Sequence, residues 1–154
     1  MCVSSSPKMN VTFIGVHARR TDSTRLETYD ETFFLRAIGI IIAGLHFPPS
    51  TCLLFIVVSD DMNWTRQKFE SALFLASEYI TDSPTRAAAV YSEGHNRPED
   101  LAILASCNHS VITIGTFGWW SAYLAGGLTV YNGHYPPENN SLVDYYPPSW
   151  IGLF

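Results

Sequence analysis

The sequence has little positive charge and no long apolar run, and each shortage excludes a class of protein. Lysine and arginine contribute nine residues against fourteen acidic ones, which gives a net charge of −5. Nucleic-acid-binding proteins usually carry a basic face, so no nucleic-acid partner is expected. The longest apolar stretch, residues 33–47, is interrupted by Arg36 and is shorter than the roughly 20 residues that span a bilayer. We expect a buried helix there.

Cysteine is also scarce, and histidine lacks the spacing of metal ligands. The three cysteines, Cys2, Cys52 and Cys107, lie far apart, which excludes a zinc motif and a dense disulfide framework. Cys52 begins an apolar segment and Cys107 ends another, so both are expected to be core thiols. Neither G-x-G-x-x-G nor G-x-x-x-x-G-K-[ST] occurs, which disfavours the common dinucleotide and phosphate loops. We therefore expect no metal and no cofactor.

The chain does contain a regular alternation of apolar strands and amphipathic helices. Strands are predicted at residues 11–18, 52–59, 87–91, 110–114 and 128–131, and helices at 30–46, 63–77, 97–107 and 116–125. This alternation predicts an α/β fold with a parallel sheet and right-handed crossovers. Asp30 is expected to cap the first helix. The Pro- and Tyr-rich tail from Pro136 is expected to be irregular.

The most informative segment joins an apolar strand to two arginines. From position 11 the chain reads Val-Thr-Phe-Ile-Gly-Val-His-Ala-Arg-Arg-Thr-Asp, so the strand delivers His17, Arg19 and Arg20 to the sheet edge. Ligands of parallel sheets bind beyond the carboxyl ends of the strands, and guanidinium groups match phosphate oxygens well. The segment therefore predicts a phosphate or pyrophosphate site. The alternative is that the arginines are only ion-paired, with Asp22 and Glu27.

Two further strand ends are polar. Residues 59–61 read Ser-Asp-Asp, and residues 115–118 read Gly-Thr-Phe-Gly where the fourth strand meets a helix. The second joint offers backbone N–H groups and the Thr116 hydroxyl at a helix N-terminus, which suits an anion. The two aspartates are expected to cap a helix rather than bind a metal, because no third carboxylate follows at ligand spacing. Asp100 is either a helix-start charge or an acceptor for a ligand.

Sequons for N-glycosylation occur at Asn10, Asn63, Asn108 and Asn139. Asn108 lies between an apolar helix and an apolar strand, and of the four it is the one least expected to be used. The other three are the candidate sites. Their number in so short a chain points to the secretory pathway.

Three blocks of the sequence match the pattern of one known family. Residues 15–22 resemble its G-V-H-V-R-R-G-D block, and residues 58–64 resemble T-S-D-D-M-x-W. Residues 95–127 resemble H-N-x-x-x-D-L-A-x-L-A-x-C followed by T-I-G-T-F-G-W-W-x-A-Y-L-A-G-G. On these blocks the chain, from about residue 11 to residue 153, resembles the C-terminal half of the galactoside 2-α-L-fucosyltransferase (α-1,2-fucosyltransferase) family.

The resemblance implies the GDP-fucose-binding half of a GT-B glycosyltransferase. Residues 1–10 would be disordered, 11–135 would form a Rossmann-like domain, and 136–154 would be its C-terminal tail. The implied reaction is an inverting, metal-independent transfer of L-fucose from GDP-fucose to the 2-hydroxyl of a terminal galactose on a glycan. A Golgi location is implied too, with an N-terminal membrane anchor that this sequence does not contain. The alternative is a non-catalytic or fragmentary GDP-sugar-binding domain that lacks the acceptor half.

The same resemblance assigns roles to individual residues. The donor-binding residues are His17, Arg19, Arg20, Asp100, Thr116 and Phe117. Arg19 would hold the β-phosphate of GDP, and His17 and Asp100 would face the guanine or its ribose. Thr116 and Phe117 would line the diphosphate pocket. Arg19 then stabilises the charge that develops on departing GDP, which is the main demand of a glycosyl-cation-like transition state.

An inverting transfer also needs a group that takes the proton of the acceptor hydroxyl. Glu27 and Asp22 are the nearest carboxylates to the arginines in the sequence. Both are candidate catalytic bases beside Arg19.

Overall fold

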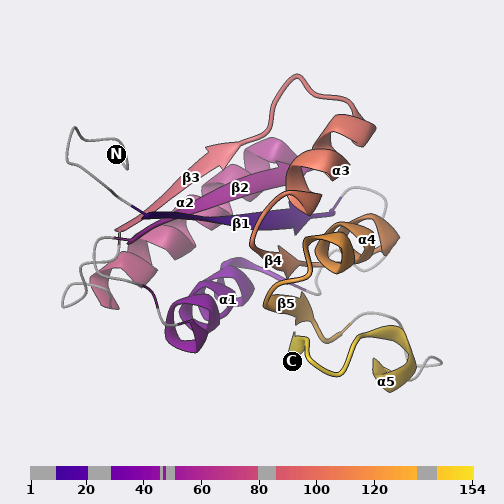
Figure 1. Ribbon diagram of the computed structural model, residues 1–154. Helices are drawn as coiled ribbons and strands as arrows, with labels where there is room; N and C mark the ends of the chain where they lie inside the picture. Colours follow the sequence, from indigo (N-terminus) through magenta and orange to yellow (C-terminus); the bar gives the residue numbers. More distant parts are fainter. Residues whose placement is uncertain (1–9, 21–28, 46, 48–50, 80–85, 135–141) are drawn as a thin grey trace.

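The computed structural model describes residues 10–20, 29–45, 47, 51–79, 86–134 and 142–154, in which strands and helices alternate (Figure 1). The strands are β1 (Asn10–Ala18), β2 (Thr51–Ser59), β3 (Arg86–Tyr91), β4 (His109–Ile112), β5 (Thr129–Asn132) and β6 (Ile151–Leu153). The helices are α1 (Glu31–Gly44), α2 (Met62–Tyr79), α3 (Arg97–Ala105), α4 (Thr116–Ala125) and α5 (Leu142–Tyr145). The predicted α/β class is confirmed.

The strands form one parallel sheet in the order β3-β2-β1-β4-β5-β6, the order of a Rossmann-like fold. β1 is central, and its residue His17 lies opposite Val58 of β2 and Ile112 of β4. α1 packs against α2, and α3 packs against α4. From β1 the chain continues to β2 and β3 on one side of this strand, and then crosses to β4, β5 and β6 on the other side. Ligands of such sheets bind in the crevice at this reversal.

The sequence of β1 explains why its two faces differ. Ile14 and Val16 are fully buried in the main core, which α1 and α2 cover. Side chains of a strand alternate between faces, so Gly15 and His17 face the opposite side. A methyl group built on Gly15 would lie 3.1 Å from Cδ2 of Leu104, so glycine lets α3 approach the strand closely. His17 is thereby directed to the side of α3 and α4.

Two predicted helix caps are present. Asp30 Oδ1 accepts hydrogen bonds from the N–H groups of Thr32 (2.8 Å) and Phe33 (3.4 Å) at the start of α1. Asp61 Oδ1 accepts from the N–H of Trp64 (3.2 Å) in the first turn of α2. These three bonds satisfy N–H groups that have no partner within the helix.

The tail after residue 136 is not irregular throughout, and that prediction was wrong. It contains α5 and β6, and β6 extends the sheet with Ile151 opposite Val130. The ring of Tyr146 stacks on that of Tyr131, with 3.7 Å between centroids. A methyl group built on Gly152 would lie 2.8 Å from the Tyr131 hydroxyl, so this close packing requires glycine. A three-residue strand is too short to show a period in the sequence.

The prediction that Cys52 is a core thiol was also wrong, because this residue is disulfide-bonded. Cys107 is a free, buried thiol, and burial raises its pKa to about 11. Thiols and half-cystines are both apolar and commonly buried. Flanking sequence therefore could not distinguish them, and spacing does not reveal pairing.

Candidate functional site

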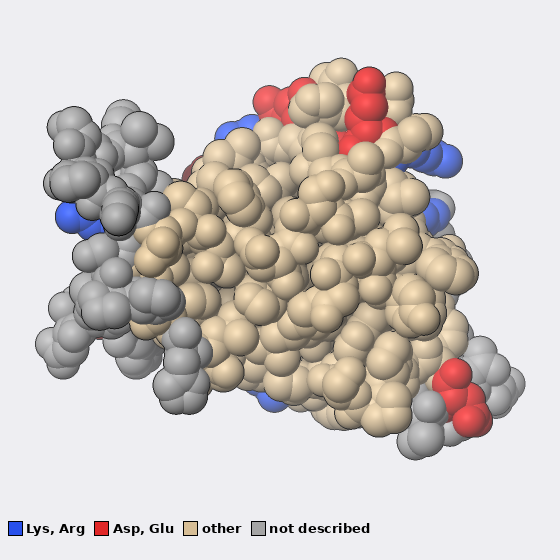
Figure 2. All heavy atoms as spheres, viewed as in Figure 1, with Lys and Arg blue, Asp and Glu red and all other residues tan. Residues whose placement is uncertain are grey.

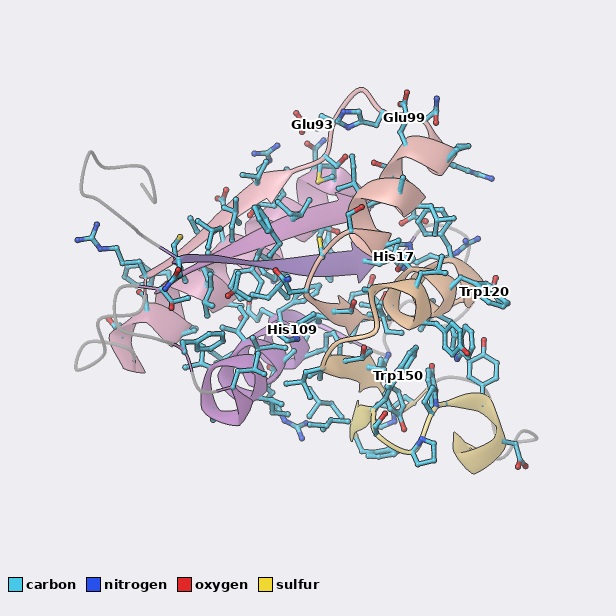
Figure 3. All side chains as sticks on the ribbon, in the orientation of Figure 1. His17, Glu93, Glu99, His109, Trp120 and Trp150 are labelled. Atoms are coloured by element: carbon cyan, nitrogen blue, oxygen red, sulfur yellow. The ribbon has the colours of Figure 1, made fainter. Side chains whose placement is uncertain are left out.

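A pocket of about 480 Å³ opens at the carboxyl ends of β1 and β2, beside α3 and α4. Its lining residues are His17, Arg19, Val58, Ser59, Asp60, Arg97, Asp100 and Phe117. Four of the six residues predicted to bind the donor, His17, Arg19, Asp100 and Phe117, are therefore brought together. Figure 3 places His17 at the end of β1, next to α4.

Arg19 is held in this pocket by its backbone. Its N–H donates to Thr113 Oγ1 (2.9 Å), and its carbonyl accepts from the Tyr29 hydroxyl (2.6 Å). Burial raises the pKa of Tyr29, so the phenol keeps its proton and remains a donor. A methyl group built on Gly115 would lie 3.3 Å from Cδ of Arg19. The arginine side chain therefore passes directly beside the start of α4.

The start of α4 suits an anion. Gly115 is its N-cap residue, has a φ of 88° that favours glycine, and makes no side-chain cap bond. The leading N–H groups of a helix carry partial positive charge. Thr116 is the first residue of α4 but does not line the pocket, whereas Phe117 does. Arg19 and this helix start lie together because β1 pairs directly with β4.

His17 is neutral in this environment. Its side chain is buried, its ring centroid lies 5.1 Å from that of Phe117, and a methyl group on Gly118 would lie 2.6 Å from its Nδ1. Within the described ranges, Nδ1 has no hydrogen-bond partner. Burial lowers the pKa of His17 to about 4; Arg19 acts in the same direction and Asp60 opposes it. A neutral imidazole suits hydrogen bonding to an uncharged part of a ligand.

His17 is expected to make stability depend on pH. Its folded pKa of about 4 lies below the ordinary 6.5, so the unfolded chain binds more protons between these values. The free energy of unfolding is therefore highest above pH 6.5, where His17 is neutral in both states. It falls by about 3 kcal/mol as the pH drops to 4 and below, because protonation of His17 then favours the unfolded chain. Urea unfolding of the parent and His17→Gln across this range measures the difference. Parallel pH profiles for the two proteins would contradict the assignment.

Arg20 makes its contacts with α2 and the residues before it. Its Nε lies 3.5 Å from Asp61 Oδ2, and its guanidinium carbon lies 3.9 Å from the centroid of the Trp64 ring. Its backbone N–H donates to Asp60 Oδ1 (2.7 Å). Arg20 is not among the lining residues. Donor binding by Arg20 therefore stays a prediction. The structure pairs this arginine with Asp61, whereas the sequence suggested Asp22 and Glu27 as ion-pair partners.

The pocket combines two cations with two carboxylates that are already hydrogen-bonded. Asp60 accepts from the Arg20 N–H, and Asp100 Oδ1 accepts from Ser92 Oγ (2.7 Å). Arg19 and Arg97 supply the positive charge. Guanidinium groups beside helix N–H groups form a site suited to phosphate oxygens.

Comparison with known proteins identifies the family. The sequence pattern of glycosyl transferase family 11 matches residues 4–154. The chain belongs to glycosyl transferase family 11. It is 34% identical over 158 residues to the galactoside 2-alpha-L-fucosyltransferase SEC1 of Bos taurus, covering 92% of this chain and 38% of that protein. It is 32% identical over 153 residues to the galactoside alpha-(1,2)-fucosyltransferase 2 of Oryctolagus cuniculus, covering 92% and 40%. This confirms the predicted family.

This family 11 chain spans about two fifths of the length of these curated relatives.

Four of its pocket residues were not assigned from the sequence: Val58, Ser59, Asp60 and Arg97. Arg97 lies three positions before Asp100 on α3, a spacing that places both on one side of a helix and could have indicated it. Asp60 joins the site only because β2 neighbours β1, which the sequence does not reveal.

Several other predicted residues of the family 11 chain are either beyond the described ranges or at exposed positions. Asp22 and Glu27, the candidate bases, and Asn139, a candidate glycosylation site, are outside the described residues. Asn10 is exposed at the start of β1, and Asn63 is exposed in the first turn of α2.

The described residues contain no group of three or more His, Cys, Asp or Glu side chains that could hold a metal ion. The face in Figure 2 is largely uncharged; acidic side chains are visible at the top, where the β3–α3 loop and the start of α3 lie, and at the lower right, near α5. Glu93 and Glu99 mark the first of these regions in Figure 3.

Proposed function

We propose that this family 11 domain binds GDP-fucose and is the donor half of a fucosyltransferase. The enzyme would transfer L-fucose to the 2-hydroxyl of a terminal galactose on a glycan, with inversion and without a required metal. The observation that carries this proposal is Arg19 lying beside the start of α4 in a pocket of about 480 Å³. The names of the relatives, galactoside fucosyltransferases, supply the sugar and the acceptor class.

Each part of the pocket suits a part of the donor. Arg19 and the first N–H groups of α4 would bind the β-phosphate, and Arg97 would add a second positive charge. His17, neutral and buried, and Asp100 would face the guanine or its ribose. Cations held beside the leaving group stabilise the charge that grows on GDP as the bond to fucose breaks.

The chemistry is a single displacement. The bond between the anomeric carbon of fucose and the β-phosphate oxygen breaks, and the electron pair leaves with GDP. The acceptor oxygen bonds to that carbon from the opposite face, which inverts its configuration. Its proton passes to a carboxylate, for which Glu27 and Asp22 remain the candidates.

A second candidate function is donor binding without transfer. Both carboxylates of the described pocket already accept hydrogen bonds, Asp60 from Arg20 and Asp100 from Ser92. The described residues therefore suit binding of a nucleoside diphosphate. They suit removal of a proton from an acceptor hydroxyl less well. Incubation with GDP-fucose and a galactose-terminated oligosaccharide distinguishes the two, since only the enzyme forms a fucosylated product.

Calorimetric titration in EDTA tests donor binding directly. GDP and GDP-fucose are expected to bind, and UDP is expected to bind at least about tenfold more weakly, because its base lacks the guanine donors. Binding in EDTA would also agree with metal independence. Equal affinities for the three nucleotides, or no binding by the folded chain, would contradict the proposal.

We place the enzyme in the Golgi lumen or membrane, as the family resemblance implies. Exposed Asn10 and Asn63 are compatible with glycosylation in the secretory pathway. Among the helices of the described ranges, none is both long and apolar enough to cross a membrane.

A further inference from the structure

A short chain of hydrogen bonds reaches the pocket from the loop between β3 and α3. Ser92 Oγ donates to Asp100 Oδ1 (2.7 Å) and lies 2.9 Å from Nδ1 of His95. A hydroxyl has one proton, which here goes to Asp100. Ser92 Oγ must therefore accept from His95, which places the proton of that ring on Nδ1. His95, Ser92 and Asp100 form one directed series of donors.

The backbone at both ends of this series is anchored. The Ser92 N–H donates to the Val57 carbonyl (2.8 Å), which ties the loop to β2. The Asn96 side chain accepts from the Glu99 N–H (3.0 Å), and the Glu99 side chain accepts from the Asn96 N–H (2.8 Å). This reciprocal cap determines where α3 begins and hence where Asp100 lies.

The bond from Ser92 decides how the Asp100 carboxylate is turned. With Oδ1 engaged by Ser92, the plane of the carboxylate is set. Each carboxylate oxygen can accept two hydrogen bonds, so Oδ1 keeps one free lone pair beside Oδ2, and both oxygens can accept from a ligand. Arg97 lies three positions earlier on α3 and also lines the pocket. Ser92 therefore opposes a rotation that would withdraw Asp100 from the pocket.

We propose that Ser92, backed by His95, is a positioning residue that orients Asp100 to recognise the guanine base of the donor. This inference rests on the proposed function. Guanine presents two adjacent donors, N1–H and the 2-amino group, which suit an oriented carboxylate. Uracil presents one donor between two carbonyl oxygens, which a carboxylate disfavours. Loss of orientation lowers base selectivity, whereas the phosphate contacts at Arg19 are unaffected.

Calorimetric titration with GDP, inosine diphosphate and UDP tests this role, because inosine diphosphate keeps N1–H and lacks the 2-amino group. The parent is expected to prefer GDP over inosine diphosphate. Ser92→Ala is expected to weaken GDP binding on the order of tenfold, the effect of losing a hydrogen bond to a charged group. The ratio of the affinities for GDP and inosine diphosphate is expected to fall close to one. Affinity for UDP stays unchanged. Ser92→Thr keeps the hydroxyl and restores the preference.

Glu93→Gln is the matched control, since Glu93 lies in the same loop and pairs with Arg66 (2.6 Å) outside the pocket. It is expected to leave all three affinities unchanged. His95→Ala, at an exposed position, is expected to lower the preference for GDP over inosine diphosphate. This variant tests the positioning role if Ser92→Ala does not fold. If the parent binds GDP and Ser92→Ala and His95→Ala keep its preference for GDP over inosine diphosphate, the positioning role alone is overturned. A folded parent that does not bind GDP overturns both this inference and the proposed function.

Discussion

Arg19→Ala is expected to weaken GDP binding at least about 100-fold while the domain stays folded. Hydrogen bonds between a guanidinium and a phosphate are charge-assisted, and truncating one partner of such a pair costs about 2–5 kcal/mol. The backbone bonds of Arg19, to Thr113 and from Tyr29, do not involve its side chain and survive the substitution. The effect is therefore expected in affinity and not in stability.

Melting curves with and without GDP measure both quantities for Arg19→Ala. Arg66→Ala is the matched control, because Arg66 is an arginine of α2 that pairs with Glu93 and does not line the pocket. Arg19→Lys is expected to bind with intermediate affinity, since an ammonium cannot form the bidentate contact of a guanidinium. Equal GDP-induced shifts in Arg19→Ala and the parent would show that Arg19 does not hold the diphosphate.

Phe69→Ala is expected to lower the free energy of unfolding by about 3–5 kcal/mol. The Phe69 side chain is fully buried, and its ring centroid lies 5.4 Å from those of Phe34 and Phe55. These rings join α2 to α1 and to β2, so the substitution leaves a cavity where helices and sheet meet. A typical domain is stable by only about 5–15 kcal/mol, so the variant is expected to be marginally folded.

Phe74→Ala offers a control on the same helix, because Phe74 is 66% exposed. We expect it to change the free energy of unfolding by less than about 0.5 kcal/mol. Urea unfolding of the parent and both variants gives the comparison. Losses of similar size for Phe69→Ala and Phe74→Ala would mean that α2 does not cover the core as described.

The main elements could be predicted because each carries its own local signal. β1 and β2 are nine-residue strands with apolar runs, and α1 begins at Glu31, directly after Asp30, whose side chain caps it as expected. β6 could not be predicted, since it has three residues and depends on pairing with β5. Its packing requires a glycine beside Tyr131, which is a relation between distant segments.

The candidate site shows the same division. His17, Arg19 and Asp100 were predicted from the residues and the family resemblance, and they meet in one pocket. Arg20, adjacent to Arg19 and chemically the same, instead contacts Asp61 and Trp64. Composition cannot separate two neighbouring arginines, because their roles depend on which elements lie beside each one.

The sequence by itself determined the family, the alternation of strands and helices, and the residue types available at each strand end. Only the tertiary structure decided which strand ends meet. Arg19 lies beside Gly115 because β1 pairs with β4, although nearly a hundred positions separate them in the chain. The lowered pKa of His17 and the bond from Ser92 to Asp100 likewise arise from burial and from the neighbouring elements. Local patterns encode local structure, whereas strand order depends on the packing of the whole chain.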